Sequence, residues 1–226
     1  VSATLVDLML ALDDPRLPVY AEPAASDGQF RGAPNGLDES DIPPLPTISR
    51  IGEYWRSSTN SAAAATPQYL ITAAEVHFLL AEAALNGWTT PLTAQQHYEA
   101  GVTAALALYD GADGVDITAA DIAAYLAEPG VAWGTGDSPL EQVIEQKWLA
   151  LYTNGPEAYA EYRRTGYPDE VQINAGHTLP YVPGRIPYPD LEQSLNAAEL
   201  QAAIQAQGID GTYTGKVWWD PVAPGS

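Results

Sequence analysis

The sequence of 226 residues predicts a mainly α-helical fold that carries long loops rich in proline and glycine. In several segments apolar residues recur at alternating spacings of three and four, which is the period of an amphipathic helix. Capping residues precede these segments, and glycine or proline follows them. No segment shows sustained alternation of apolar and polar residues, so strands are expected to be few and short.

The first part of the chain is predicted to be mostly loop. A short apolar stretch, Leu5–Leu12, is followed by segment 13–66, which is dense in proline and glycine. Proline fixes φ and removes a backbone donor, so we expect loops and short extended pieces packed on the rest of the chain. A loop of this length inside a compact domain is usually functional.

Segment 67–110 is predicted to form an antiparallel helical hairpin of the tetratricopeptide type. Its first helix is expected to begin at Thr66, as an N-cap, and to end at Asn86. Thr93 and Gln96 form a capping box for the second helix. One such unit cannot bury its apolar face alone, because repeats need neighbours, so the chain is expected to be part of a larger helical array.

Segment 118–208 is predicted to contain further helices and loops. Four helical stretches are marked by caps at their starts and by glycine or proline at their ends. They are Thr118–Ala127, Ser138 to about Thr153, Glu157–Thr165, and Asn196–Gly208.

The composition excludes several classes of function. With 9 Lys+Arg against 29 Asp+Glu, the formal charge is −20, which disfavours nucleic acids and anionic membrane surfaces as partners. No apolar run approaches the roughly 20 residues that span a bilayer. The absence of cysteine removes disulfides and thiolate chemistry. Few lysines and many acids fit a salt-adapted source, and an ordinary acidic secreted protein is the alternative.

Seven segments, taken in order, resemble the SusD/RagB family, and in particular its SusD-like branch called starch-binding associated. They are DDPRLPVY (Asp13–Tyr20), GAPNG (Gly32–Gly36), YLITAAEVHFLLAEAALNGW (Tyr69–Trp88), HYEAGVTAAL (His97–Leu106), EQVIEQKWLALYTNGPEAYAEYRRTGYP (Glu141–Pro168), GRIPYP (Gly184–Pro189) with Glu192 and Asn196, and KVWWD (Lys216–Asp220). The resemblance implies that residues 1–226 form the C-terminal portion of a SusD-like domain.

The resemblance also implies a function. Such a protein captures a glycan or oligosaccharide at the surface of the outer membrane, without catalysis, and delivers it to a SusC-like TonB-dependent transporter. A lipid anchor, attached through a segment absent from this chain, would hold it to the membrane. The strong negative charge favours a neutral polymer over an acidic one. The alternatives are a helical-repeat interaction scaffold without a small-molecule ligand, or a glycoside hydrolase.

Aromatic residues outside the predicted helix interiors are the candidate ligand contacts, because the C–H-rich face of a pyranose packs against a ring. They are Tyr20, Tyr54, Trp55, Trp133 and Tyr181, with Arg56 beside the central pair as a hydrogen-bonding group. Each ring has an alternative role: Trp55, for example, would instead anchor its loop on the helices.

No catalytic, metal or cofactor site is predicted. Glu141 and Glu145 lie one helical turn apart, but acids at this spacing usually form a solvated face rather than the pair that a glycosidase needs. The acids of Asp110–Asp116 fall every third residue, which does not match a calcium-binding EF-hand loop. The three histidines lack companion ligand spacing.

Overall fold

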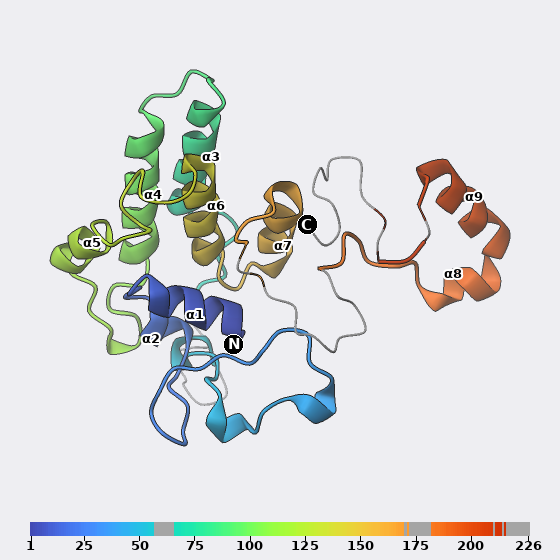
Figure 1. Ribbon diagram of the computed structural model, residues 1–226, viewed down its shortest axis with the longest axis horizontal. Coiled ribbons are helices and arrows are strands. Elements are labelled where there is room, and N and C mark those ends of the chain that lie inside the picture. Colours follow the sequence, from blue (N-terminus) through green and yellow to red (C-terminus); the bar gives the residue numbers. More distant parts are fainter. Residues whose placement is uncertain (57–65, 170, 172–181, 210, 214, 216–226) are drawn as a thin grey trace.

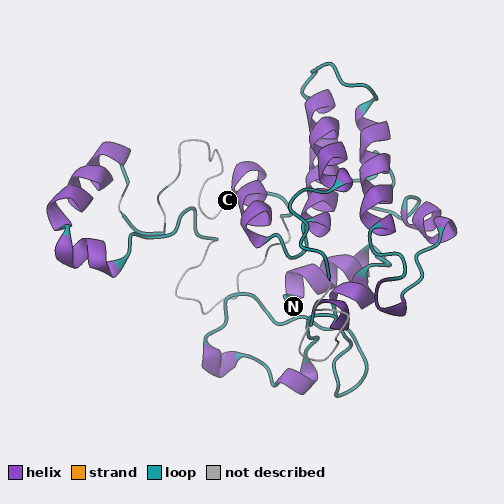
Figure 2. Ribbon diagram, turned by 180° about the vertical axis from the view of Figure 1, so that it is seen from behind, coloured by secondary structure: helices purple, strands orange, loops and turns teal. Residues whose placement is uncertain are grey.

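The computed structural model describes residues 1–56, 66–169, 171, 182–209, 211–213 and 215. Within these residues the fold is helical, with two isolated bridges and no strand, as predicted (Figures 1 and 2). In chain order the helices are α1 (Ala3–Ala11), α2 (Leu17–Tyr20), α3 (Ala73–Leu85), α4 (Ala94–Ala107), α5 (Ala119–Tyr125), α6 (Pro139–Ala150), α7 (Gly155–Thr165), α8 (Asp190–Leu195) and α9 (Ala197–Gln207).

Helices α3 and α4 form the predicted antiparallel hairpin, and α6 packs along α3 (Figure 1). The core of the hairpin is made by Phe78, whose ring lies so close to Gly101 that a Cβ there would stand 2.7 Å from it. Tyr98 and Val102 of α4 are fully buried beside it. The small residue at the crossing therefore allows the two helices to approach closely around an aromatic ring.

The predicted start of the first hairpin helix is wrong. Thr72 caps α3, and its hydroxyl accepts the backbone N–H of Glu75 at 3.2 Å. Thr66, the expected cap, instead donates its hydroxyl to the carbonyl of Tyr54 at 2.8 Å. At Thr93 the predicted capping box is present and α4 follows directly.

Three helices fall where none was predicted. The opening apolar stretch is α1, capped by the hydroxyl of Ser2, and α2 lies inside the predicted loop. Helix α8 begins after Pro189 and precedes α9 (Figure 2). The other predicted helices are confirmed as α5, α6, α7 and α9. Much of the proline-rich stretch before α8, and the KVWWD segment, lie outside the described residues.

Helix α7 is joined to α6 and α3 by a chain of charges. Lys147 of α6 is buried, and its Nζ lies 3.2 Å from Oε2 of Glu161 on α7. The same carboxylate accepts Nη2 of Arg164 at 2.8 Å, and Arg164 also pairs with both carboxylate oxygens of Glu82 on α3. Because the charges are paired, this network fixes α7 against the hairpin.

Five tyrosines are buried or nearly so, and burial raises the pKa of each phenol. They are Tyr20, Tyr98, Tyr109, Tyr125 and Tyr152.

These shifts predict that stability falls as the pH rises above about 10, the ordinary tyrosine value. Below that pH both states are protonated; above it the unfolded chain loses protons that the folded chain retains, which favours unfolding. Tyrosinate absorbance and circular dichroism should therefore change together in an alkaline titration. Ionisation of all 13 tyrosines near their ordinary pKa, with the helical signal intact, would contradict this prediction.

None of the helices in the described ranges is both long and apolar enough to cross a bilayer.

Candidate functional site

The predicted group Tyr54–Trp55–Arg56 sits on a single 3-10 turn, η3 (Glu53–Trp55). Gly52, which precedes the turn, donates its N–H to the carbonyl of Tyr20 at 3.0 Å. There is no room for a side chain at this glycine, since a Cβ would overlap the carbonyl oxygen of Val19. The turn is thereby fixed directly on helix α2.

Trp55 is half-buried, with its ring held edge-on by three tyrosines. The ring centroids lie 4.9 Å from Tyr54, 5.9 Å from Tyr109 and 5.6 Å from Tyr152. Tyr109 follows α4 and Tyr152 follows α6, so the indole packs on the ends of both helices. Trp55 therefore anchors its loop on the helices; the residue as a whole is half-buried, and its indole Nε1 is buried.

Tyr54 and Arg56 flank this indole, and both are half-buried. Burial, together with a hydrogen bond to Tyr69, raises the pKa of Tyr54 to about 12, so this phenol stays protonated at neutral pH. Arg56 forms an ion pair with Glu22. We name the group Tyr54, Trp55, Arg56 and Glu22 the aromatic turn. It offers ring surface beside charged hydrogen-bonding groups, the combination that sugar binding requires.

Tyr20 has a different position from the one expected. It has no exposed surface, stacks on Tyr152 with centroids 4.1 Å apart, and donates its hydroxyl to the carbonyl of Leu149 at 3.1 Å. A ring enclosed in this way has no face free for a sugar. Tyr20 is a core residue beneath the aromatic turn, and it is not carried into the proposal below.

Trp133 lies in a separate place. Its half-buried ring stands 5.2 Å from that of Tyr98, and no ring contact among the described residues joins it to the aromatic turn. The loop around it is held by Gln142, whose amide donates to the carbonyls of Gly130 and Ala132 and accepts the N–H of Gly134. Tyr181, the remaining candidate, lies outside the described residues.

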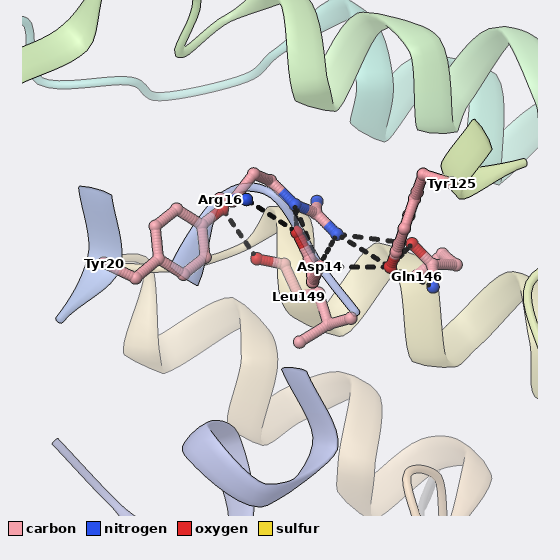
Figure 3. Close-up of polar contacts among 6 residues, drawn as sticks. All are labelled: Asp14, Arg16, Tyr20, Tyr125, Gln146 and Leu149. Carbon is pink, nitrogen blue, oxygen red and sulfur yellow. Dashed lines mark hydrogen bonds and ion pairs between the residues drawn. The ribbon is translucent and has the colours of Figure 1, made fainter. Parts of the chain in front are cut away.

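A buried ion pair positions α2 and hence the aromatic turn (Figure 3). Arg16 Nη2 lies 2.5 Å from Oδ2 of Asp14, and neither side chain is exposed. Burial alone would lower the pKa of Arg16, but the Asp14 carboxylate raises it well above its usual range. The hydroxyl of Tyr125 donates to the same carboxylate at 3.1 Å, and Arg16 reaches Gln146 at 3.4 Å. The network thus ties the turn before α2 to α5 and α6.

The space beside the aromatic turn is small. A cavity of about 10 Å³ lined by Tyr69, Tyr109 and Tyr152 has room for one water molecule. In the described part of the chain, no three histidine, aspartate or glutamate side chains gather as metal ligands. Tyr54, Trp55 and Arg56 do not line this cavity, and each of them is half-buried.

Sequence patterns did not indicate Glu22 as a member of the aromatic turn, or Tyr109 and Tyr152 as the rings that support it. All three residues stand far from Trp55 in the chain, and none belongs to a local motif that includes it. Only the fold brings them together.

Comparison with known proteins gives a consistent result. Residues 1–189 match the SusD-like family described as "Starch-binding associating with outer membrane". A chitin-binding protein of known structure is 28% identical, with a TM-score of 0.79 over 98% of this chain and 50% of its own. A chitin-binding SusD homologue from Flavobacterium johnsoniae is 27% identical, with a TM-score of 0.75. The match covers 100% of this chain and 50% of the homologue.

A SusD homologue from Bacteroides fragilis NCTC 9343 is 27% identical, with a TM-score of 0.77 over 96% of this chain and 51% of its own. The chain thus spans about half the length of these solved structures. The search of curated proteins gave no match. Since the family model covers 1–189 and the helical fold agrees with that of the SusD homologues, the chain belongs to the SusD-like family.

Proposed function

We propose that this protein binds glycans at the outer-membrane surface, without catalysis, and passes them to a SusC-like TonB-dependent transporter. The observation that carries the proposal is the SusD-like match over residues 1–189, which comes with structural similarity to two chitin-binding proteins. Chitin is a neutral polymer of N-acetylglucosamine. A neutral ligand also suits a chain with a charge of −20.

The aromatic turn is the proposed contact surface. Trp55 and Tyr54 are supported from behind by Tyr109 and Tyr152, so their orientation is set before a ligand arrives. Arg56 is held by Glu22, which leaves both charged groups beside the rings. Preorganised rings reduce the entropy lost on binding, which supports this surface as a sugar platform.

Replacing Trp55 by alanine should weaken binding of chitin or starch oligosaccharides by about three- to ten-fold, the value of one aromatic packing contact. Trp133→Ala tests the second predicted ring in the same way. Isothermal titration calorimetry with the 226-residue chain would measure both.

Trp88→Ala is the matched control, because Trp88 is 72% exposed at the end of the α3–α4 hairpin and touches neither candidate group. If both Trp55→Ala and Trp133→Ala bind as tightly as the parent, the assigned surfaces are wrong. If the parent protein binds none of the glycans tested, the proposed function is contradicted and an interaction scaffold is favoured. Release of reducing sugar from polysaccharide would favour a hydrolase.

Delivery to the transporter needs a separate test. Co-purification with a SusC-like transporter would support it, and a loss of glycan uptake on deletion of this protein would support it further. The lipid anchor and the assignment of this chain to the C-terminal half of the family's domain stay predictions.

A further inference from the structure

A second surface, which shares no residue with the aromatic turn or with the Trp133 loop, has the size of a ligand site. It is an open groove of about 420 Å³, within the usual range of about 300–1,000 Å³ for small-molecule sites. It runs between the end of α1, the turn that leads into α2, and α5. Its lining includes Leu10, Asp13, Pro18, Phe30, Asp121 and Glu128.

The groove has an apolar wall that is open to solvent. Leu10 is 50% exposed, Pro18 is exposed, and Phe30 is half-buried. Leu10 and Pro18 belong to α1 and α2, and the buried Asp14–Arg16 pair lies in the turn that joins these two helices. The wall therefore persists without a ligand, as a surface against which the C–H face of a sugar ring can pack.

The rest of the lining is acidic. Four carboxylates contribute to it and no cationic side chain does. Asp14 is neutralised by Arg16 behind the groove. Asp13, Asp121 and Glu128 have no cationic partner in the part of the chain that the structure describes. Asp121 is held at the start of α5, where its Oδ2 accepts the backbone N–H and the hydroxyl of Thr118. Three carboxylates of the lining, none with a cationic partner among the described residues, thus stand around an apolar wall. This arrangement favours a ligand carrying both a ring and a positive charge.

From this juxtaposition we infer that the groove binds amino sugars with a free, protonated amine, in preference to their N-acetylated counterparts. The inference rests on the proposed function and adds to it a second, separate surface that selects glycans carrying unacetylated 2-amino sugars, beside the neutral glycans proposed for the aromatic turn. A sugar fits better than a lysine side chain, since a groove of about 420 Å³ with several apolar side chains in its lining offers contact area for a ring.

Two substitutions remove charge from the groove with little change in shape. Asp13 has a φ of 51°, in the left-handed region that asparagine tolerates at least as well as aspartate. Glu128→Gln is isosteric. The matched control is Asp113→Asn combined with Glu199→Gln, because Asp113 is also exposed with a φ of 54° and neither residue lines the groove. Both double variants lose the same net charge.

The experiment compares oligomers of glucosamine and of N-acetylglucosamine by calorimetry at about pH 6, where the sugar amine is protonated. The parent should bind the glucosamine oligomer more tightly. Asp13→Asn/Glu128→Gln should lower that affinity by about four- to twenty-five-fold, or about two- to five-fold for each charge, and leave the affinity for the N-acetylated oligomer unchanged. The preference should vanish in about 1 M salt, where the Debye length is about 3 Å.

Several results would overturn the inference. An equal loss in the control double variant would assign the preference to the overall charge of the chain. Equal affinity of the parent for both oligomers would show that the groove does not select an amine. A lysine trimer that binds as tightly, with the same loss in Asp13→Asn/Glu128→Gln, would assign the groove to a basic protein segment. Failure to bind either oligomer, or any other glycan, would instead contradict the proposed function.

Discussion

Replacing Arg16 by methionine should lower the free energy of unfolding by about 3–5 kcal/mol, the cost of breaking a buried ion pair by removing one partner. The Asp14 side chain would stay buried, and its hydrogen-bond donors would be the hydroxyl of Tyr125 and the backbone N–H of residue 16. The carboxylate would then be charged without a counter-ion, or would have to bind a proton. Denaturant unfolding monitored by circular dichroism would measure the change.

Two further variants separate this effect from a general loss of charge. Arg31→Met breaks the pair with Asp27, in which both side chains are nearly half exposed, and should cost less than about 1 kcal/mol. Asp14→Asn combined with Arg16→Met removes both charges and should recover part of the lost stability. If the free energies of unfolding of Arg16→Met and Arg31→Met differ by less than about 1 kcal/mol, the Asp14–Arg16 pair does not hold α2 in place.

Replacing Gly52 by alanine should reduce both stability and glycan affinity. A Cβ at this position would overlap the carbonyl of Val19, a backbone atom that cannot move without shifting α2. Overpacking of this kind costs about 1–3 kcal/mol. Because η3 begins at the next residue, the shift would also displace Trp55 from Tyr109 and Tyr152. Denaturant unfolding and calorimetry with one oligosaccharide would report the two effects.

Gly155→Ala is the matched control, since no atom lies within 4 Å of a Cβ built there and the residue opens helix α7. It should leave glycan affinity unchanged and stability unchanged or slightly higher. A Gly52→Ala variant with the parent's glycan affinity would contradict this prediction. It would show either that the aromatic turn keeps its position without the close contact between Gly52 and α2, or that the turn does not contact the glycan.

Local signals explain which parts of the fold the sequence predicts. The caps at Thr93, Thr118 and Ser138 each bond a backbone N–H three residues away, so the whole signal lies in a few adjacent residues. The error at Thr66 has the same origin. Thr66 carried the local signal, but its hydroxyl donates to the carbonyl of Tyr54, twelve residues away, and Thr72 caps α3 instead.

The site depends on distant residues, and for that reason much of it could not be predicted. The sequence singled out Trp55 because of its loop, but the tyrosines behind it come from the ends of two helices. Tyr20 was a candidate because it falls outside the predicted helices, whereas it lies in the short helix α2 and has no exposed surface. No pattern marks an arginine for complete burial, since charged side chains are almost always solvated unless paired.

The links between α2 and α6 also set an order of folding. Arg16 contacts a residue 130 positions later in the chain, and the hydroxyl of Tyr152 reaches back to the carbonyl of Tyr20, 132 positions away. During synthesis the first twenty residues therefore emerge long before their partners exist. The α3–α4 hairpin, whose contacts are local, forms without them. The segment beneath the aromatic turn therefore reaches its folded contacts only after α6 has been synthesised.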